Sequence, residues 1–196
     1  MSALVLIPWA ATEWTASGRL AARTPLPLTE AGRAQAEAWG REFATREFFG
    51  VYTSEEQTSL ETAKAVALGA GAKVRDLDGL EEVHFGLWEG LTEETLKSRF
   101  PKAYKRWRED PSSVCPPEGE DLAEAAARIR KALRTVKRKM ERASVAVVLG
   151  PTACALVRCE LAGAPLSELR AYLAQTPIEY SDAEQTLQAV TPTPTD

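Results

Sequence analysis

The sequence predicts an α/β fold, a three-layer sandwich in which helices cover both faces of a mostly parallel central sheet. Three observations lead to this prediction. Short apolar runs typical of buried strands occur at residues 3–7, 48–53 and 144–149. Helical patterns follow these runs, and strands that alternate with helices pair in parallel. The length of 196 residues suits one domain with a sizeable core, expected at residues 1–190.

The first expected strand covers residues 3–7 and ends at Pro8, because proline has no N–H for a sheet ladder. A loop to Thr24 follows, at the carboxyl end of the strand, where open α/β sheets bind ligands. Thr29 is a good N-cap for a helix expected at residues 30–44. The apolar positions of that helix are Ala34, Ala38 and Phe43.

The same patterns predict the remaining short elements. Strands are expected at residues 73–77 and 144–149. Helices are expected from Ser54 to Leu68, from Thr92 to an interruption at Phe100-Pro101, from Pro151 to Leu161, and after Pro165. Residues 178–180 and 186–190 are expected to form a terminal hairpin, and residues 191–196 a disordered tail.

The longest helix is expected at about residues 120–142. Its buried stripe would consist of Leu122, Ala126, Ile129, Leu133, Val136 and Met140. Eight Lys or Arg residues between Arg128 and Arg142 lie on its other faces, which we interpret as a solvated surface. An anionic partner is the alternative, and the net charge of -4 argues against it.

Composition excludes several classes of function. A net charge of -4 gives no general attraction to nucleic acid or to a membrane. No apolar run reaches the roughly 18 residues of a membrane span, and the N-terminus lacks the basic region of a signal peptide. The three cysteines Cys115, Cys154 and Cys159 have no zinc spacing, so we expect reduced thiols and a cytoplasmic location. We expect no metal and no cofactor.

Residues 4–15, Leu-Val-Leu-Ile-Pro-Trp-Ala-Ala-Thr-Glu-Trp-Thr, resemble the start of the histidine phosphatase superfamily, the phosphoglycerate mutase-like phosphatases and mutases. The family signature there is Arg-His-Gly-x-Thr-x-x-Asn. Two further segments resemble family motifs: Gly18 to Gly32, which includes Arg19 and Arg23, and Leu80 to Gly90, Leu-Glu-Glu-Val-His-Phe-Gly-Leu-Trp-Glu-Gly. The resemblance spans Leu4 to Gly163 and implies the phosphoglycerate mutase-like form of the predicted sandwich.

The resemblance also shows which pocket positions differ from the family. Pro8 stands at the first Arg, Trp9 at the nucleophilic His, Thr15 at the Asn, Thr58 at the second Arg and Gly150 at the second His. The family chemistry needs two histidines, and this chain has only His84, which we interpret as structural. Glu82 matches the family's catalytic carboxylate and is the one vestige of the machinery. Thr152 lies at the helix start after Gly150, where N–H groups could meet an anion.

These differences favour a catalytically inactive relative, a pseudoenzyme with a binding, regulatory or structural role and no catalytic residue. Its pocket would be plugged by Trp9 or remodelled around it for an uncharged ligand. The partner would be a protein or a small molecule, and a homodimer is compatible with the sequence.

Two alternatives stay open. The first is a phosphoric-ester hydrolase or mutase-like enzyme of altered mechanism. Its base would be Glu82, its hydroxyl donors Thr15, Thr58 and Thr152, and its anion contacts Arg19 and Arg23. The second is an interaction module that uses the basic face of the long helix.

Overall fold

The computed structural model describes residues 2–21, 23–140, 143–173 and 176–181. Its sheet has the strand order β3-β2-β4-β1-β5. The strands are β1 (Ala3–Pro8), β2 (Phe48–Thr53), β3 (Val74–Asp76), β4 (Ser144–Leu149) and β5 (Ile178–Ser181). All pairings are parallel except that of β5 with β1, which is antiparallel.

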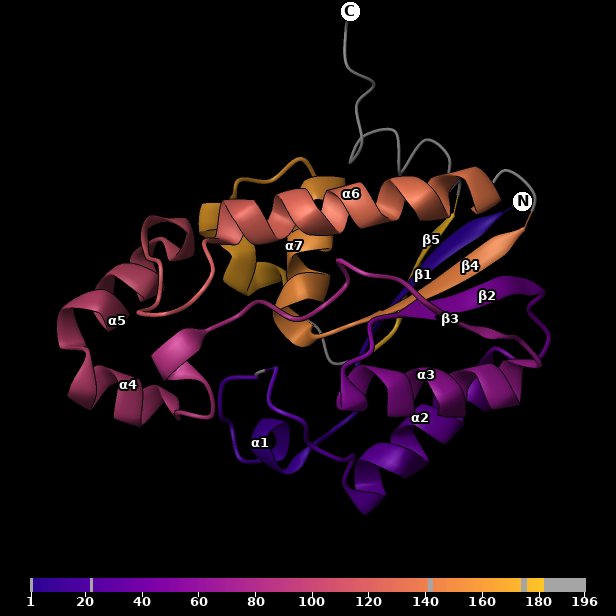
Figure 1. Ribbon diagram of the computed structural model, residues 1–196, viewed down its shortest axis with the longest axis horizontal. Helices are drawn as coiled ribbons and strands as arrows, with labels where there is room; N and C mark the ends of the chain where they lie inside the picture. Colours follow the sequence, from indigo (N-terminus) through magenta and orange to yellow (C-terminus); the bar gives the residue numbers. More distant parts are fainter. Residues whose placement is uncertain (1, 22, 141–142, 174–175, 182–196) are drawn as a thin grey trace, which may run out of the picture.

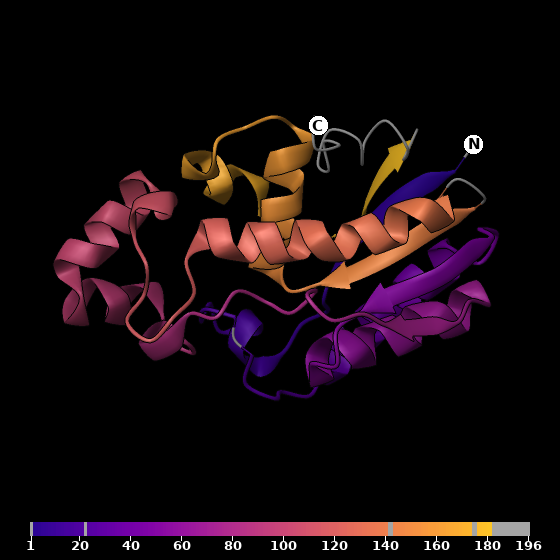
Figure 2. The same cartoon turned by 45° about the horizontal axis from the view of Figure 1, so that its top comes forward.

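Helices cover both faces of this sheet (Figure 1). The α-helices are α1 (Glu13–Ala16), α2 (Glu30–Glu42), α3 (Gln57–Ala70), α4 (Glu93–Arg99), α5 (Pro101–Glu109), α6 (Leu122–Met140) and α7 (Pro151–Leu161). The 3-10 helices are η1 (Gly86–Trp88), η2 (Pro111–Ser113) and η3 (Leu166–Tyr172). Figure 2 shows α6 and α7 on one side of the sheet and α2 and α3 on the other.

The two faces of β1 belong to two separate cores. Leu4 and Leu6 pack with buried residues of α6 and α7, whereas Val5 and Ile7 pack with residues of α2 and α3. Side chains of a strand alternate between faces, so one buried strand can serve two helix layers. The predicted three-layer α/β sandwich with a mostly parallel sheet is confirmed.

The buried stripe of α6 is confirmed, since all six predicted residues are almost fully buried. Two cations of its other faces differ from the expected solvated surface. Arg128 turns toward the loop at residues 79–84, where it binds Glu81 and Glu120, and Arg130 pairs with Glu160. A boundary position beside an apolar stripe lets an arginine bury its stem and still reach a carboxylate.

The apolar face predicted for α2 is wrong at Ala34 and Ala38, which are exposed. The buried residues are Gly32, Ala36, Trp39 and Gly40. A Cβ atom on Gly69 of α3 would lie 2.5 Å from the carbonyl carbon of Gly40, so these two helices meet at glycines. Close approach of two backbones selects small residues, and a search for large apolar side chains does not detect them.

Smaller differences concern the ends of elements. Strand β1 includes Pro8, because β5 reaches only as far as Leu6 and leaves no ladder partner for the missing N–H. Helix α3 begins at Gln57 rather than Ser54, whose hydroxyl donates to Glu56. The predicted strand at residues 186–190 and the predicted tail at residues 191–196 lie outside the described residues. No helix in the described ranges is long and apolar enough to cross a membrane.

Candidate functional site

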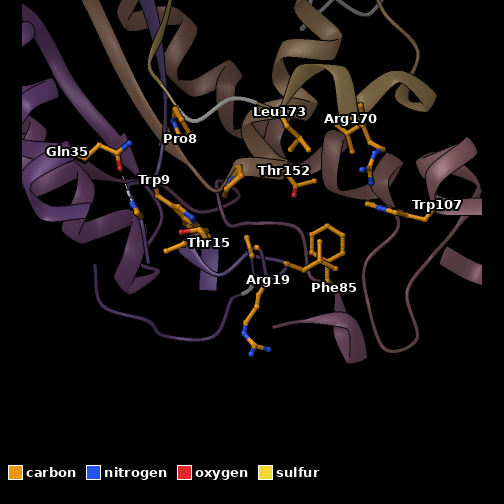
Figure 3. A pocket seen from close by; sticks show the side chains of 17 residues that line it. Pro8, Trp9, Thr15, Arg19, Gln35, Phe85, Trp107, Thr152, Arg170 and Leu173 are labelled. Atoms are coloured by element: carbon orange, nitrogen blue, oxygen red, sulfur yellow. Dashed lines mark hydrogen bonds between the residues drawn. The ribbon is translucent and has the colours of Figure 1, made fainter. Parts of the chain in front are cut away.

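A cavity of about 400 Å³ opens at the carboxyl ends of β1 and β4 (Figure 3). Its walls come from β1, the loop at residues 9–21, α2, the loop before η1, α5, the start of α7 and η3. The lining residues are Pro8, Trp9, Ala11, Thr15, Ala16, Gly18, Arg19, Leu20, Ala21, Gln35, Phe85, Trp107, Pro151, Thr152, Leu169, Arg170 and Leu173. The sheet edge thus brings together segments that are far apart in the sequence.

Five of the residues singled out from the sequence line this cavity: Pro8, Trp9, Thr15, Arg19 and Thr152. The other four, Arg23, Thr58, Glu82 and Gly150, do not line it. Each of these four has close contacts elsewhere, described below. The structure therefore divides the expected pocket into two regions.

Trp9 forms a wall of the cavity. Its side chain is only 6% exposed and packs in the core beneath α2 and α3. The backbone N–H of Trp9 donates to the Leu149 carbonyl at 2.8 Å and so continues the β1–β4 pairing. Within the described part of the chain, the indole Nε1–H has no hydrogen-bond partner. The indole borders an open volume rather than filling it.

The loop after β1 is held by its own hydroxyl groups. Thr15 Oγ1 accepts from the Thr12 N–H at 2.8 Å and donates to the Thr12 carbonyl at 3.1 Å. This capping box fixes the start of α1. Arg19 Nη1 donates to the Gly90 carbonyl at 2.9 Å, which ties this loop to the segment after η1. The Thr15 hydroxyl is therefore already in use by the backbone.

Glu82 lies behind the cavity wall and is fully buried. Its carboxylate accepts from the N–H groups of Val83 at 2.6 Å, Thr152 at 2.8 Å and Ala153 at 2.8 Å. The first N–H groups of a helix have no partner within the helix, so this carboxylate caps α7. We call this arrangement the carboxylate cap. It occupies the N–H groups at the helix start, which are no longer free to meet an anion.

Burial raises the pKa of Glu82 to about 7, against the three N–H donors that favour its ionised form. Gly150 provides the space for this side chain. A Cβ atom at Gly150 would lie 2.4 Å from Glu82 Oε2. A side chain at residue 150 and the present position of Glu82 therefore exclude each other.

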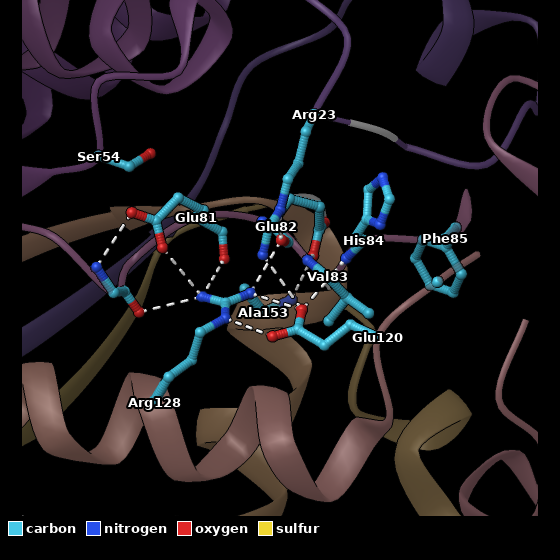
Figure 4. Close-up of polar contacts among 12 residues, drawn as sticks. Arg23, Ser54, Glu81, Glu82, Val83, His84, Phe85, Glu120, Arg128 and Ala153 are labelled. Atoms are coloured by element: carbon cyan, nitrogen blue, oxygen red, sulfur yellow. Dashed lines mark hydrogen bonds and ion pairs between the residues drawn. The ribbon is translucent and has the colours of Figure 1, made fainter.

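Arg128 of α6 fixes the loop that carries Glu82 (Figure 4). Its guanidinium donates to the carbonyls of Gly79 at 3.1 Å, Glu81 at 2.8 Å and Glu82 at 2.9 Å. It also binds Glu120, with Nε 2.6 Å from Oε1. Burial acts to raise the pKa of Glu120, but the hydrogen bonds and charge of Arg128 outweigh it and lower the pKa. Arg128 also lies 3.2 Å from the carboxylate of Glu81, so it holds the loop by three carbonyls and one carboxylate.

Arg23 belongs to the same network and not to the cavity. Its Nε donates to the Glu82 carbonyl at 2.8 Å, and its Nη2 lies 3.1 Å from Glu120 Oε2. Thr58 is also engaged, since its hydroxyl donates to the Leu26 carbonyl at 2.7 Å. The structure therefore places neither Arg23, the expected anion contact, nor Thr58, the expected hydrogen-bond donor, in the cavity.

Sequence reasoning missed Trp107 and Arg170, which line the cavity from α5 and η3. Neither belongs to a motif with fixed spacing, and only the fold brings them to the sheet edge. Trp107 packs edge-on against Phe85 and Trp88, with ring centroids 5.6 and 5.7 Å away. The only available signal was the concentration of aromatic residues in the segment from Phe85 to Trp107.

Other titratable groups lie outside the cavity. Cys154 is buried, as expected of a packing residue, and burial raises the pKa of its thiol to about 12. The imidazole of His84 is partly exposed and lies 3.6 Å from Glu89. No group of three or more His, Cys, Asp or Glu side chains in the described ranges is arranged to hold a metal ion.

The chemistry of the cavity follows from its lining. Over the residues that the structure describes there, the charged groups are the guanidiniums of Arg19 and Arg170, and imidazole, thiol, carboxylate and amine groups are absent. Such a lining can hold a ligand by apolar contact, hydrogen bonds and positive charge. Its described nucleophilic groups are the hydroxyls of Thr15 and Thr152, and that of Thr15 already donates to the Thr12 carbonyl.

Comparison with known proteins shows a consistent set of relatives. The model of the family described as "Histidine phosphatase superfamily (branch 1)" matches residues 4–191. Phosphoserine phosphatase 1 of Hydrogenobacter thermophilus is 28% identical over 168 residues, or 86% of this chain and 80% of that protein. Glucosyl-3-phosphoglycerate phosphatase of Mycobacterium tuberculosis is 31% identical over 127 residues, or 65% of this chain and 56% of that protein. The chain therefore matches just over half of this second relative's length.

Solved structures of similar shape agree with the fold. Bacillus stearothermophilus YhfR superposes with a TM-score of 0.79 at 27% identity, over 86% of this chain and 84% of that chain. A mycobacterial glucosyl-3-phosphoglycerate phosphatase in complex with VO3 gives a TM-score of 0.81 over 94% of both chains, at 24% identity. That second likeness bears on the fold alone.

Proposed function

The chain belongs to the histidine phosphatase superfamily, branch 1, and on that premise we propose that it is a binding protein without phosphatase chemistry. The observation that carries this proposal is the composition of the cavity lining, which over its described residues holds no imidazole, thiol, carboxylate or amine. Phosphoryl transfer through histidine needs a nucleophile, charged oxygen ligands and an acid for the leaving group.

The residues at the pocket positions support the proposal. The resemblance places the nucleophile at residue 9, where the structure has an indole in the cavity wall. Loss of an essential nucleophile costs about a million-fold in kcat. Pro8 and Thr58 carry no charge at the positions of the two arginines, and Thr58 is bonded to a backbone carbonyl.

Glu82 also supports a role in binding rather than chemistry. A general base must come within hydrogen-bond reach of the water or hydroxyl that it activates. The carboxylate of Glu82 is fully buried, does not line the cavity and accepts from three backbone N–H groups. In this protein the vestigial acid would serve as a structural cap.

The pocket is remodelled and not plugged. Trp9 borders a volume of about 400 Å³, which lies within the usual range of small-ligand sites, about 300–1,000 Å³. The ligand would meet Trp9 on one side and η3 on the other.

A weak phosphoric-ester hydrolase is the second candidate. Two observations favour it. The two relatives described above are phosphatases by name, and burial raises the pKa of Glu82 to about 7, which suits a general acid or base at neutral pH. To act, Glu82 would have to leave the N-terminus of α7 and reach the cavity.

Turnover of a broad phosphomonoester panel tests the two candidates. We expect the natural protein to remain at the uncatalysed rate. The variant Pro8→Arg, Trp9→His, Thr58→Arg, Gly150→His should gain activity, because it has the family's two arginines and two histidines. The histidine at residue 150 would also displace Glu82 from the cap. Displacement of Glu82 threatens folding. The triple variant Pro8→Arg, Trp9→His, Thr58→Arg, which keeps Gly150, is therefore the control for the quadruple variant. Turnover by the natural protein that Glu82→Gln abolishes would contradict the proposal and establish the hydrolase.

A further inference from the structure

Most of the cavity wall is apolar. The apolar lining residues are Pro8, Trp9, Leu20, Phe85, Trp107, Pro151, Leu169 and Leu173, besides three alanines. Figure 3 shows Trp9 and Trp107 on opposite sides of the cavity, with Thr152 between them. Two aromatic walls with space between them suit a ligand with a flat or bulky apolar body.

The charge on the lining is positive. Arg170 extends beside Trp107 in Figure 3, whereas Arg19 lies lower in that view and donates to Gly90. None of the described lining residues carries a carboxylate, and Glu93, which pairs with Arg170, lies outside this lining. Arg170 is the more loosely held of the two, because its Nη2 donates to Glu93 Oε1 at 3.5 Å, whereas Arg19 Nη1 donates to the Gly90 carbonyl at 2.9 Å.

Glu93 is already shared. Its Oε1 lies 2.7 Å from Arg108 Nη1 and 2.7 Å from the Tyr104 hydroxyl. Hydrogen bonds from Tyr104 and Arg108 hold the pKa of Glu93 below its usual range, so it is ionised at neutral pH. One carboxylate therefore serves two arginines, and the longer of its two ion pairs is the one to Arg170. An incoming anion can take that guanidinium without leaving Glu93 unpaired.

The size of the positive charge limits the ligand. A phosphoryl dianion needs several charged or N–H donors. Here the helix-start N–H groups are taken by Glu82, and Arg23 is bound to Glu120. An uncharged ligand would cover the guanidinium of Arg170 and leave it only its long contact with Glu93, which is shared with Arg108. A ligand with a single negative charge on an apolar body matches the guanidinium of Arg170 and the apolar wall.

We infer that the cavity binds a small organic monoanion, a carboxylate on an aromatic or bulky apolar body. The carboxylate pairs with Arg170 and accepts from the Thr152 hydroxyl, and the body lies between Trp9 and Trp107. The inference rests on the proposed function, because the ligand is held and not converted. It replaces the uncharged ligand expected from the sequence, since that expectation did not include Arg170.

Three probes that share one ring system test the inference: 1-naphthoate, 1-naphthalenemethanol and 1-naphthyl phosphate. Each is titrated into the full chain by calorimetry. We expect 1-naphthoate to bind at least about tenfold more tightly than the alcohol, because a charge-assisted bidentate contact is lost with the carboxylate. The inference would be overturned if 1-naphthoate showed no saturable binding up to about 5 mM, because such a dissociation constant is weaker than that of a specific site.

Substitutions locate the binding. Arg170→Gln should weaken 1-naphthoate about tenfold and leave the alcohol unchanged, and Arg170→Lys, which keeps the charge but not the fork, should lose less. Arg134→Gln removes the same charge from an exposed position of α6 and is the matched control. Equal weakening by Arg134→Gln and Arg170→Gln, or no effect of either, would contradict a site at Arg170.

The phosphate ester separates the two proposals. Release of 1-naphthol from 1-naphthyl phosphate by the natural protein would overturn the proposed function, whatever 1-naphthoate does. An unreacted ester together with absent 1-naphthoate binding would overturn only the inference about the ligand. An ester that binds more tightly than 1-naphthoate would also overturn it, because the site would then prefer a dianion.

Discussion

The carboxylate cap and the cavity lie at the same edge of the sheet and are built on opposite principles. In the cap, the Glu82 carboxylate meets three N–H groups, is fully buried and excludes even a Cβ atom from Gly150. In the cavity, Arg170 and Thr152 border open volume, and the nearest carboxylate to Arg170 is shared with Arg108. Polar groups that are hydrogen-bonded to one another contribute to stability, whereas polar groups that border a cavity can bind a ligand.

This difference divides the expected effects of substitution. Changes at the cap and at the network around Arg128 should alter the free energy of unfolding and have little direct effect on a ligand. Changes at the cavity should alter binding and leave stability almost unchanged. The division holds only if substitutions at the cap change stability and substitutions at the cavity change binding.

The largest effect is expected from Arg128→Ala. The substitution removes the donors to the carbonyls of Gly79, Glu81 and Glu82 and leaves the half-buried Glu120 without its closest partner. Breaking such a pair costs about 3–5 kcal/mol, so urea denaturation should show a loss of about 4 kcal/mol. Arg134→Ala on the same helix should cost less than about 0.5 kcal/mol. Similar small losses for both variants would mean that the loop does not depend on Arg128.

The pH dependence of stability should show the buried Glu82. Burial raises its pKa from 4.5 to about 7 in the folded protein. The folded state therefore holds a proton that the unfolded state has released, and stability falls as the pH rises from 4.5 through 7. A shift of this size corresponds to about 3 kcal/mol.

Comparison with Glu82→Gln isolates this contribution, because the other carboxylates titrate in both proteins. The difference in unfolding free energy between the natural protein and Glu82→Gln should change by about 3 kcal/mol between pH 4 and pH 8. A difference that stays constant over that range would show that the pKa of Glu82 is the same in the folded and the unfolded protein.

A smaller loss is expected from Gly150→Ala, because the new Cβ atom would lie 2.4 Å from Glu82 Oε2. Overpacking of this kind costs about 1–3 kcal/mol, and we expect about 2 kcal/mol by thermal or urea denaturation. The double variant Gly150→Ala, Glu82→Ala should lose less than the sum of the single variants. Removal of the carboxylate relieves the two shortest contacts and leaves the one with the Cβ atom of residue 82, at 2.7 Å. Additive losses would argue against direct contact between residues 82 and 150.

The smallest stability effect belongs to the cavity. Arg170 is exposed and has one long ion pair, so Arg170→Gln should change the free energy of unfolding by less than about 0.5 kcal/mol. The same variant should weaken the anionic probe described above. A loss of several kcal/mol would show that Arg170 is a structural residue like Arg128, and the division between cap and cavity would disappear.

Strong periodicity made most of the fold predictable. The spacing of Leu122, Ile129 and Met140 defined the buried face of α6, and the apolar runs defined β1, β2 and β4. The packing face of α2 was not predictable in this way, because it depends on Gly40 and its close approach to Gly69. Apolar periodicity reveals faces with large side chains, but it does not reveal the packing face of helices that meet at glycines.

The site was predictable only where short motifs carry it. Trp9 and Thr152 follow strand ends directly, so their place at the sheet edge could be expected from local sequence. Trp107 and Arg170 reach the cavity only through the packing of α5 and η3. The position of Glu82 was beyond prediction for another reason. Two of its three partners are backbone N–H groups about 70 residues away, and the identity of a residue does not show what its backbone N–H will bind.

Phosphate release from the phosphomonoester panel, by the natural protein and by Glu82→Gln in parallel, tests most directly whether Glu82 caps a helix instead of catalysing. The account predicts the uncatalysed rate for both proteins at every pH from 5 to 9. Acceleration by the natural protein of about a thousand-fold or more, lost in Glu82→Gln, would contradict it. In that case the carboxylate would leave the start of α7 during turnover, and the chain would be a phosphatase.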